Sequence, residues 1–153
     1  MPGYFFDTSV IAKLYHAEDG SDKAEALVAG TDARSIVSQL SLIEIQSVFA
    51  TKVRTGAIDQ TSLDQLRSLF FADLASGRFK VVLVSLRYFR SAERLIRLHA
   101  VNHALRTLDG LQLAVAVELH RRNMVSAIVA SDRHLGEVAA LEGLPVINPL
   151  QTP

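Results

Sequence analysis

The sequence predicts an α/β fold, namely a three-layer α/β/α sandwich with a five-stranded parallel sheet. Short apolar runs alternate with longer segments of helical periodicity along the whole chain, which is typical of strand–helix repeats. The short runs are continuously apolar rather than alternating, as expected for parallel strands that are buried on both faces. The 153 residues are expected to form a single domain, because no internal repeat or low-complexity segment divides residues 1–153.

Five segments are predicted to be strands because they are short, apolar and mostly rich in β-branched or aromatic residues. Parallel neighbours need crossover connections, which are expected to be right-handed. The predicted strands cover residues 4–6, 35–38, 79–84, 127–130 and 145–147.

Seven helices are predicted between these strands. Thr8 and Ser9 are expected to cap the first helix, and Asp59 or Thr61 the fourth. Glycines such as Gly56 mark helix ends. The predicted helices cover residues 10–16, 22–29, 40–55, 59 or 61 to 75, 86–99, 107–122 and 132–142.

The composition excludes several classes of protein. There is no cysteine, which excludes a disulfide framework and a thiolate zinc site. No apolar run approaches the ~20 residues that span a bilayer. The first residues, MPGYFFDTSVIAKLY, lack the basic leader of a signal peptide. We therefore expect a cytoplasmic protein with no membrane association.

Charge is unevenly distributed although the net charge is zero. Residues 1–76 hold six basic and ten acidic side chains, and residues 77–153 hold ten basic and six acidic ones. Arg87, Arg90, Arg94 and Arg97 lie on one predicted helical stripe. This stripe is interpreted first as a solvated helix face, and second as a surface that meets RNA phosphates or an acidic partner segment.

Four acids lie where a strand passes into a helix or in an early turn of a helix. Ligands of doubly wound sheets bind beyond the carboxyl ends of the strands, so these acids are expected at one rim. Each also has a local explanation as an N-cap or first-turn acid, and Ser41 with Glu44 fits an S-x-x-E capping box. The four acids are Asp7, Glu44, Asp109 and Asp132.

The conjunction of these acids favours a metal site over four separate caps. Their neighbours are apolar, and partly buried carboxylates that crowd together repel one another unless a cation neutralises them. Oxygen ligands without cysteine suit Mg²⁺ or Mn²⁺. Such an ion activates a water and stabilises charge on a scissile phosphate, so phosphodiester hydrolysis is the predicted reaction.

Four segments in order resemble the PIN-domain family, and closely the VapC-type toxin ribonucleases of type II toxin–antitoxin systems. They are FDTSVIAKLY at 6–15, SLIEIQSVF at 41–49, LRTLDGLQLAVA at 105–116 and ASDRHL at 130–135. The resemblance implies an endoribonuclease that cuts RNA with Mg²⁺ or Mn²⁺, forms a homodimer, and is inhibited by an antitoxin whose C-terminal tail covers the site.

The resemblance also implies residue roles. Asp7 and Asp109 match the direct metal ligands, Glu44 and Asp132 complete the site, and Ser9 supports the first acid. The sequence departs from the family at two places. Many relatives carry Thr or Ser where this chain has Ala130, which leaves Ser131 as the nearest hydroxyl to the fourth acid. Relatives often have a small non-glycine residue and a His in the segment that matches Gly110 to Gln112, a difference interpreted as packing.

Other side chains are assigned weaker roles. Arg106, Arg133 and the arginine stripe are predicted to steer RNA. The histidines show no paired ligand spacing and are interpreted as surface or packing residues. The aromatic side chains at core-like spacings are interpreted as packing. These last two sets are His16, His99, His103, His120 and His134, and Phe70, Phe71, Phe79, Tyr88 and Phe89.

Three alternatives share parts of this pattern. A haloacid-dehalogenase-like phosphatase needs a second acid where Ser9 stands. A response-regulator receiver needs adjacent acids and a late lysine, whereas Phe6 precedes Asp7 and no lysine follows Lys80. A catalytically silent PIN scaffold that acts as a binding module is the third alternative.

Overall fold

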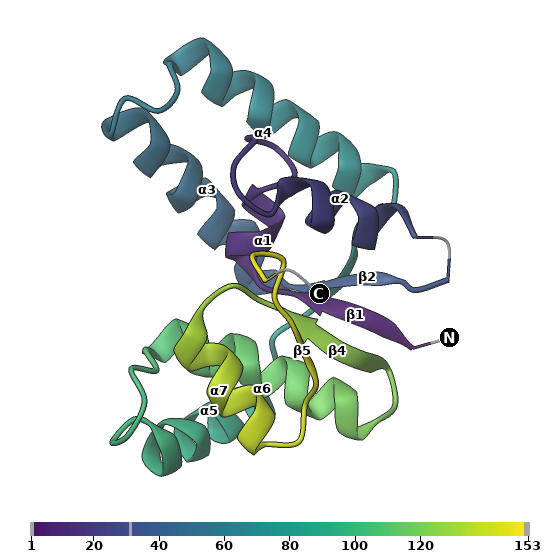
Figure 1. Ribbon diagram of the computed structural model, residues 1–153, viewed down its shortest axis with the longest axis vertical. Helices are drawn as coiled ribbons and strands as arrows, with labels where there is room; N and C mark the ends of the chain where they lie inside the picture. Colours follow the sequence, from purple (N-terminus) through teal and green to yellow (C-terminus); the bar gives the residue numbers. More distant parts are fainter. Residues whose placement is uncertain (1, 31, 152–153) are drawn as a thin grey trace.

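A five-stranded, all-parallel sheet lies at the centre of the computed structural model, which describes residues 2–30 and 32–151 (Figure 1). The strand order is β3-β2-β1-β4-β5, which places the first strand in the middle. Each pair of neighbours runs parallel, as predicted. The strands are β1 (Gly3–Phe6), β2 (Ser35–Ser38), β3 (Lys80–Val82), β4 (Val125–Val129) and β5 (Val146–Ile147).

Seven helices are formed by the described residues, and they cover both faces of the sheet. Helices α1 to α4 lie on one side of the sheet and α5 to α7 on the other, which confirms the predicted three layers (Figure 1). The helices are α1 (Thr8–Ala12), α2 (Ser21–Ala29), α3 (Gln39–Arg54), α4 (Gln60–Ala75), α5 (Leu86–His99), α6 (Thr107–Arg121) and α7 (Arg133–Leu141).

Two hydrophobic cores flank the sheet because successive strand residues point to opposite faces. Phe5 packs with α5, α6 and α7, whereas its neighbour Phe6 packs with the helices of the other face. Ile128 and Val129 of β4 divide between the two cores in the same way. The continuously apolar strands are therefore explained by burial on both faces.

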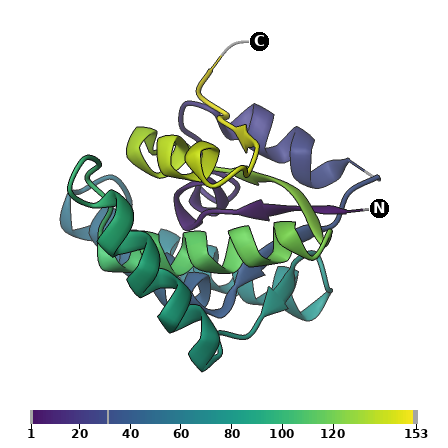
Figure 2. The ribbon, with the colours of Figure 1, turned by 90° about the horizontal axis from the view of Figure 1, so that it is seen from below.

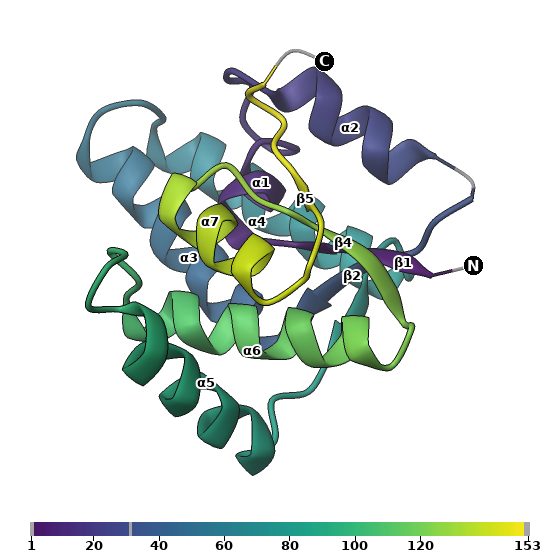
Figure 3. The ribbon, with the colours of Figure 1, turned by 60° about the horizontal axis from the view of Figure 1, so that its bottom comes forward.

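Helix α5 packs along α6, as Figures 2 and 3 show from two directions. A Cβ atom added at Gly110 would lie 3.0 and 3.1 Å from two carbons of the Ile96 side chain. Gly110 thus permits close contact between the two helices, in line with the packing explanation for this departure from the family. Helix α6 carries Asp109 at its first turn, so this contact also fixes the position of one acid.

The first helix differs from its prediction. It begins at Thr8 with Asp7 at the N-cap position and ends at Ala12, instead of covering residues 10–16. The backbone N–H groups of Lys13, Leu14 and Tyr15 bond to carbonyls three residues back, at 3.0–3.2 Å. The apolar periodicity therefore continues past Ala12 in tighter turns of the 3₁₀ type.

Other deviations are small. Strand β3 covers only Lys80–Val82 rather than 79–84, because it is an edge strand that pairs with four-residue β2 alone. Phe70, Phe79 and Tyr88 are buried as predicted, whereas Phe71 and Phe89 are more than half exposed and contradict the packing interpretation. No helix within the described ranges is long and apolar enough to cross a membrane.

Candidate active site

A pocket of about 710 Å³ lies beyond the carboxyl ends of the strands, and all four acids line it. Asp7 follows β1, Glu44 lies in α3 after β2, Asp109 lies in the first turn of α6, and Asp132 follows β4. Ser9 and Arg106 also line this pocket. Ser131 and Arg133 are not among its lining residues, although each adjoins Asp132 in sequence.

Asp7 is held at the centre of this edge. Its backbone N–H donates to the carbonyl of Val129 at 3.0 Å, so it extends the pairing of β1 with β4. Asp7 occupies the N-cap position of α1, yet its side chain makes no capping bond. Its Oδ2 accepts instead from Ser9 Oγ at 2.7 Å, the contact expected for a supporting hydroxyl. The cap explanation for Asp7 is therefore wrong.

The surroundings of Asp7 disfavour its ionised form. Burial is the main cause that raises the pKa of Asp7, and the negative charges of Glu44 and Asp109 act in the same direction. The hydrogen bond from Ser9 opposes them, and the resulting pKa is about 6 instead of 3.8. The carboxylates of Asp7, Glu44 and Asp109 therefore lie close enough for their negative charges to interact. An added cation would lower the electrostatic cost of their crowding.

Glu44 does not take part in a capping box. Helix α3 begins at Gln39, after Ser38 at the N-cap position, and Ser41 is fully buried. The Oε1 atom of Glu44 accepts from Thr8 Oγ1 at 3.1 Å and from Gln112 Nε2 at 2.6 Å. Ser41 bonds within the same group, since Thr8 Oγ1 lies 3.0 Å from its Oγ.

Gln112 is a central residue of the site that sequence reasoning treated as packing. It is fully buried one turn after Asp109. Its side-chain amide contacts Glu44 and the hydroxyl groups around it. Its Nε2 lies within bonding distance of Glu44, Ser41 (3.0 Å) and Thr8 (3.2 Å), and its Oε1 accepts from Ser38 Oγ at 2.7 Å. The available signal for this role was a single polar residue within the apolar run from Leu111 to Val117.

Asp109 and Asp132 combine a place in the pocket with a local structural role. Asp109 Oδ2 accepts from the backbone N–H of Arg106 at 3.0 Å. Asp132 Oδ1 accepts from the backbone N–H of Leu135 at 2.8 Å and caps α7. Each bond engages one carboxylate oxygen. Asp132 therefore caps α7, as one explanation predicted, and it also lines the pocket that the other three acids line.

The far end of the pocket is lined by polar residues of α3 that sequence reasoning missed. Lys52 lies two turns after Glu44 on the same helix face, and its Nζ contacts Glu18 Oε2 at 3.1 Å and His16 Nδ1 at 3.0 Å. The i, i+4, i+8 spacing of Glu44, Val48 and Lys52 was the available signal. The pocket is thus acidic at one end and carries a lysine at the other.

The remaining predicted residues have other surroundings. Arg133 pairs with Glu137 at 3.4 Å, and Ser131 Oγ is buried without a hydrogen-bond partner among the described residues. Three arginines of the stripe pair within the chain, which favours the solvated-face interpretation: Arg87 with Glu118, Arg94 with Glu142, and Arg97 with Glu93.

The donor set fits a hard divalent cation. Every acid in the pocket offers carboxylate oxygen, and no sulfur or imidazole lines it. Burial and the neighbouring negative charges disfavour the ionised form of Asp7, and a bound cation would favour it. Arg106 contacts Asp109 at 3.8 Å, but its side chain is 90% exposed and gives little neutralisation.

Comparison with known proteins agrees with this geometry. Residues 4–141 match the PIN domain family. The chain is 30% identical to Ribonuclease VapC45 of Mycobacterium tuberculosis over 140 residues, which are 92% of each protein.

Two solved structures share the fold at low sequence identity. VapBC2 from Rickettsia felis superposes with a TM-score of 0.65 at 15% identity, covering 95% of this chain and 97% of that one. Mycobacterium tuberculosis VapC20, described as a sarcin–ricin loop cleaving toxin, gives 0.65 at 17% identity, covering 88% and 94%. The match of residues 4–141 to the PIN domain family, rather than to a phosphatase or receiver family, disfavours those two alternatives. With this match over nearly its whole length, and with four acids at the carboxyl edge of a five-stranded parallel sheet, the chain belongs to the PIN-domain family.

Proposed function

We propose that this chain is a Mg²⁺- or Mn²⁺-dependent endoribonuclease and the toxin of a toxin–antitoxin pair. The observation that carries the proposal is the convergence of Asp7, Glu44, Asp109 and Asp132 in one pocket. The relative named Ribonuclease VapC45 and the structural neighbour VapC20 support RNA as the substrate. A cytoplasmic location, where RNA is abundant, is part of the proposal.

Asp7 and Asp109 hold the cation in this proposal, and Glu44 and Asp132 complete its surroundings. When bound, a divalent ion lowers the pKa of a water and stabilises negative charge on the scissile phosphate. Ser9 orients one oxygen of Asp7 through its 2.7 Å hydrogen bond. Gln112 fixes Glu44 in the same way, so both acids are oriented before substrate arrives.

Basic residues near the pocket position the RNA backbone. Arg106 lines the pocket with a side chain that is 90% exposed, and it is available to meet a phosphate. Lys52 lines the opposite end. Arg133 is also well exposed and adjoins Asp132. We assign these cations to steering and binding rather than to the chemical step.

An antitoxin and a second copy of the chain are the proposed protein partners. The structural neighbours include a toxin–antitoxin complex from Klebsiella pneumoniae, with a TM-score of 0.62. Ile43 and Leu108 line the pocket while their side chains are 71% and 48% exposed. Exposed apolar side chains beside a charged pocket suit a partner segment that covers the site.

The test is cleavage of total RNA, including structured tRNA and ribosomal RNA, with Mg²⁺, with Mn²⁺ and with EDTA. Asp7→Asn should abolish cutting while circular dichroism shows an intact fold. Asp59→Asn is the matched control, because Asp59 caps α4 far from the pocket lining and Asn is an equally good cap. Equal cutting by wild type and Asp7→Asn, or no cutting with either ion, would overturn the proposal.

A further inference from the structure

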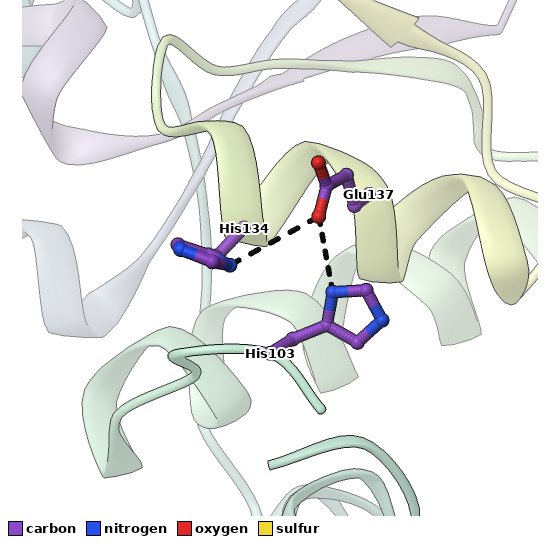
Figure 4. A group of neighbouring side chains, drawn as sticks. All are labelled: His103, His134 and Glu137. Carbon is purple, nitrogen blue, oxygen red and sulfur yellow. Dashed lines mark hydrogen bonds and ion pairs between the residues drawn. The ribbon is translucent and has the colours of Figure 1, made fainter. Parts of the chain in front are cut away.

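A second group of metal-ligand side chains lies beside the acids without belonging to their pocket. His103 comes from the connection between α5 and α6, and His134 and Glu137 come from α7 (Figure 4). His103 Nδ1 lies 3.0 Å from Glu137 Oε2, and His134 Nδ1 lies 3.9 Å from the same oxygen. One ligand atom from each residue lies within 4.8 Å of the others. None of the three lines the acidic pocket.

His134 supplies an observation of its own. Its Nδ1 atom is buried, and no hydrogen-bond partner reaches it from the residues that the structure describes. The atom nonetheless faces Glu137 and the ring of His103, whose centroid lies 6.3 Å from that of His134 (Figure 4). A buried ring nitrogen without a partner costs free energy, and coordination to a metal would satisfy it.

We propose that His103, His134 and Glu137 form a binding site for Zn²⁺ or a similar transition-metal ion. Two imidazoles and one carboxylate are a ligand set that zinc accepts, with water in a fourth position. Bonds of about 2.0–2.1 Å in tetrahedral geometry separate ligand atoms by roughly 3.3–3.5 Å. The 3.0 and 3.9 Å separations bracket that value, so small side-chain adjustments complete the site.

The chemistry of the donors separates this site from the acidic pocket. Imidazole nitrogen favours zinc, nickel, cobalt and copper, whereas Mg²⁺ favours the all-oxygen acids. Glu137 directs Oε2 at the two histidines and Oε1 at Arg133, 3.4 Å away. The Arg133 side chain is 79% exposed, so it can move away from an arriving cation. The ligands themselves are 21%, 34% and 42% exposed, which leaves a path for the ion.

A metal at this place would join two elements that carry acids. His103 precedes α6, whose first turn holds Asp109, and His134 follows Asp132 by two residues. Bound zinc would fix the start of α6 against α7 and stabilise the folded chain by mass action. Zn²⁺ binding at this site would therefore restrict the motion of the segments that carry Asp109 and Asp132.

The experiment is a calorimetric Zn²⁺ titration of untagged, metal-stripped protein in excess Mg²⁺, which occupies the acidic pocket. We expect one Zn²⁺ per chain. His103→Gln and His134→Gln should each weaken Zn²⁺ binding at least tenfold, and Glu137→Gln should weaken it as well. His99→Gln is the matched control. His99 also contacts a glutamate, Glu142, at 3.2 Å, but among the described residues this pair belongs to no group of three metal-ligand side chains. The Zn²⁺ affinity of His99→Gln should equal that of wild type.

A variant that lacks two of the pocket acids distinguishes Zn²⁺ binding at this site from Zn²⁺ binding at the acidic pocket. Asp7→Asn combined with Asp109→Asn should keep the Zn²⁺ site. Zn²⁺ should raise the melting temperature of that double variant, but not that of the triple variant that also carries His134→Gln. Zn²⁺ binding that survives all three ligand substitutions would overturn the proposal. So would Zn²⁺ binding that disappears with the two aspartates. Neither outcome depends on RNA cleavage, so failure here leaves the proposed function standing.

Discussion

Asp7 and Glu142 are two poorly accessible carboxylates of the same chain with opposite surroundings. The Glu142 side chain is 11% exposed and contacts Arg94, His99 at 3.2 Å and Arg121 at 3.6 Å. Burial acts to raise the pKa of Glu142, but the hydrogen bonds and the positive charges of Arg94 and His99 together outweigh burial, and the pKa is lowered. At Asp7, burial and two neighbouring acids raise the pKa to about 6.

The two carboxylates differ in whether the folded chain supplies a positive charge beside them. Around Glu142, the folded chain itself supplies the positive charge. Around Asp7, the chain supplies a serine hydroxyl and more negative charge, so the matching cation has to come from solution. Crowded acids that remain unmatched in the fold are costly for stability, which indicates that they serve another purpose.

The largest expected effect is on catalysis. Asp109→Asn should lower the RNA cleavage rate by at least about 100-fold, because losing a metal ligand forfeits several kcal/mol of transition-state stabilisation. Glu142→Gln should leave the rate of the folded protein within about twofold. Single-turnover cleavage at saturating Mg²⁺ measures both variants. Equal losses in the two variants would erase the distinction between these carboxylates.

Stability should change in opposite directions. Glu142→Gln should lower the free energy of unfolding by about 2 kcal/mol, because Arg94 and His99 lose their ionised partner. Asp7→Asn should raise it in EDTA at pH 7. The shift from 3.8 to about 6 corresponds to about 3 kcal/mol, reduced to about 2 kcal/mol because solvent reaches the pocket. Urea unfolding followed by circular dichroism checks both signs.

The pH dependence sharpens the same contrast. The folded-state pKa of Asp7 is raised, so the folded chain holds a proton that the unfolded chain releases between pH 3.8 and about 6. Stability therefore falls through this window, and the advantage of Asp7→Asn should grow across it and level off above. Glu142 has a lowered pKa, so its contribution is present above 4.5 and lost below it. Thermal melts in EDTA from about pH 3 to about pH 7, a range that extends about one unit beyond these values, test this divergence.

A smaller effect is expected at Gln112. Gln112→Met keeps the volume but removes the 2.6 Å bond to Glu44 and leaves Ser38 Oγ without its acceptor. Cleavage should fall about tenfold and the free energy of unfolding by roughly 1–2 kcal/mol. Gln46→Met is a control, since Gln46 lies on α3 outside the pocket lining. A Gln112→Met enzyme as active as wild type would exclude a positioning role.

Much of the fold could be predicted because its signals are local. Burial on both faces accounts for continuous apolar strands, and Asp59 marks the start of α4 because its side chain accepts from Ser62 N–H. The position of the acids at one edge followed from the geometry of parallel sheets. The tight turns after Ala12 could not be predicted, since α-helical and 3₁₀ segments share nearly the same apolar spacing.

Errors arose where a local motif competed with a tertiary contact. Ser41 and Glu44 have capping-box spacing, but β2 delivers the chain so that Ser38 takes the N-cap position and Ser41 is buried. Gln112 contacts Ser38 and Thr8 from 74 and 104 residues away. His103 and His134 approach each other from distant segments in the same way. The spacing of residues in the sequence does not predict such contacts between distant segments.

The central position of β1 has a consequence for the order of synthesis. Of the five strands, β1 is translated first, yet one of its two neighbours, β4, is made more than a hundred residues later, and Asp132 follows β4. A nascent chain that stops before residue 125 has Asp7 without its bond to Val129 and lacks the fourth acid. The acidic pocket is therefore complete only after nearly all of these residues have been translated.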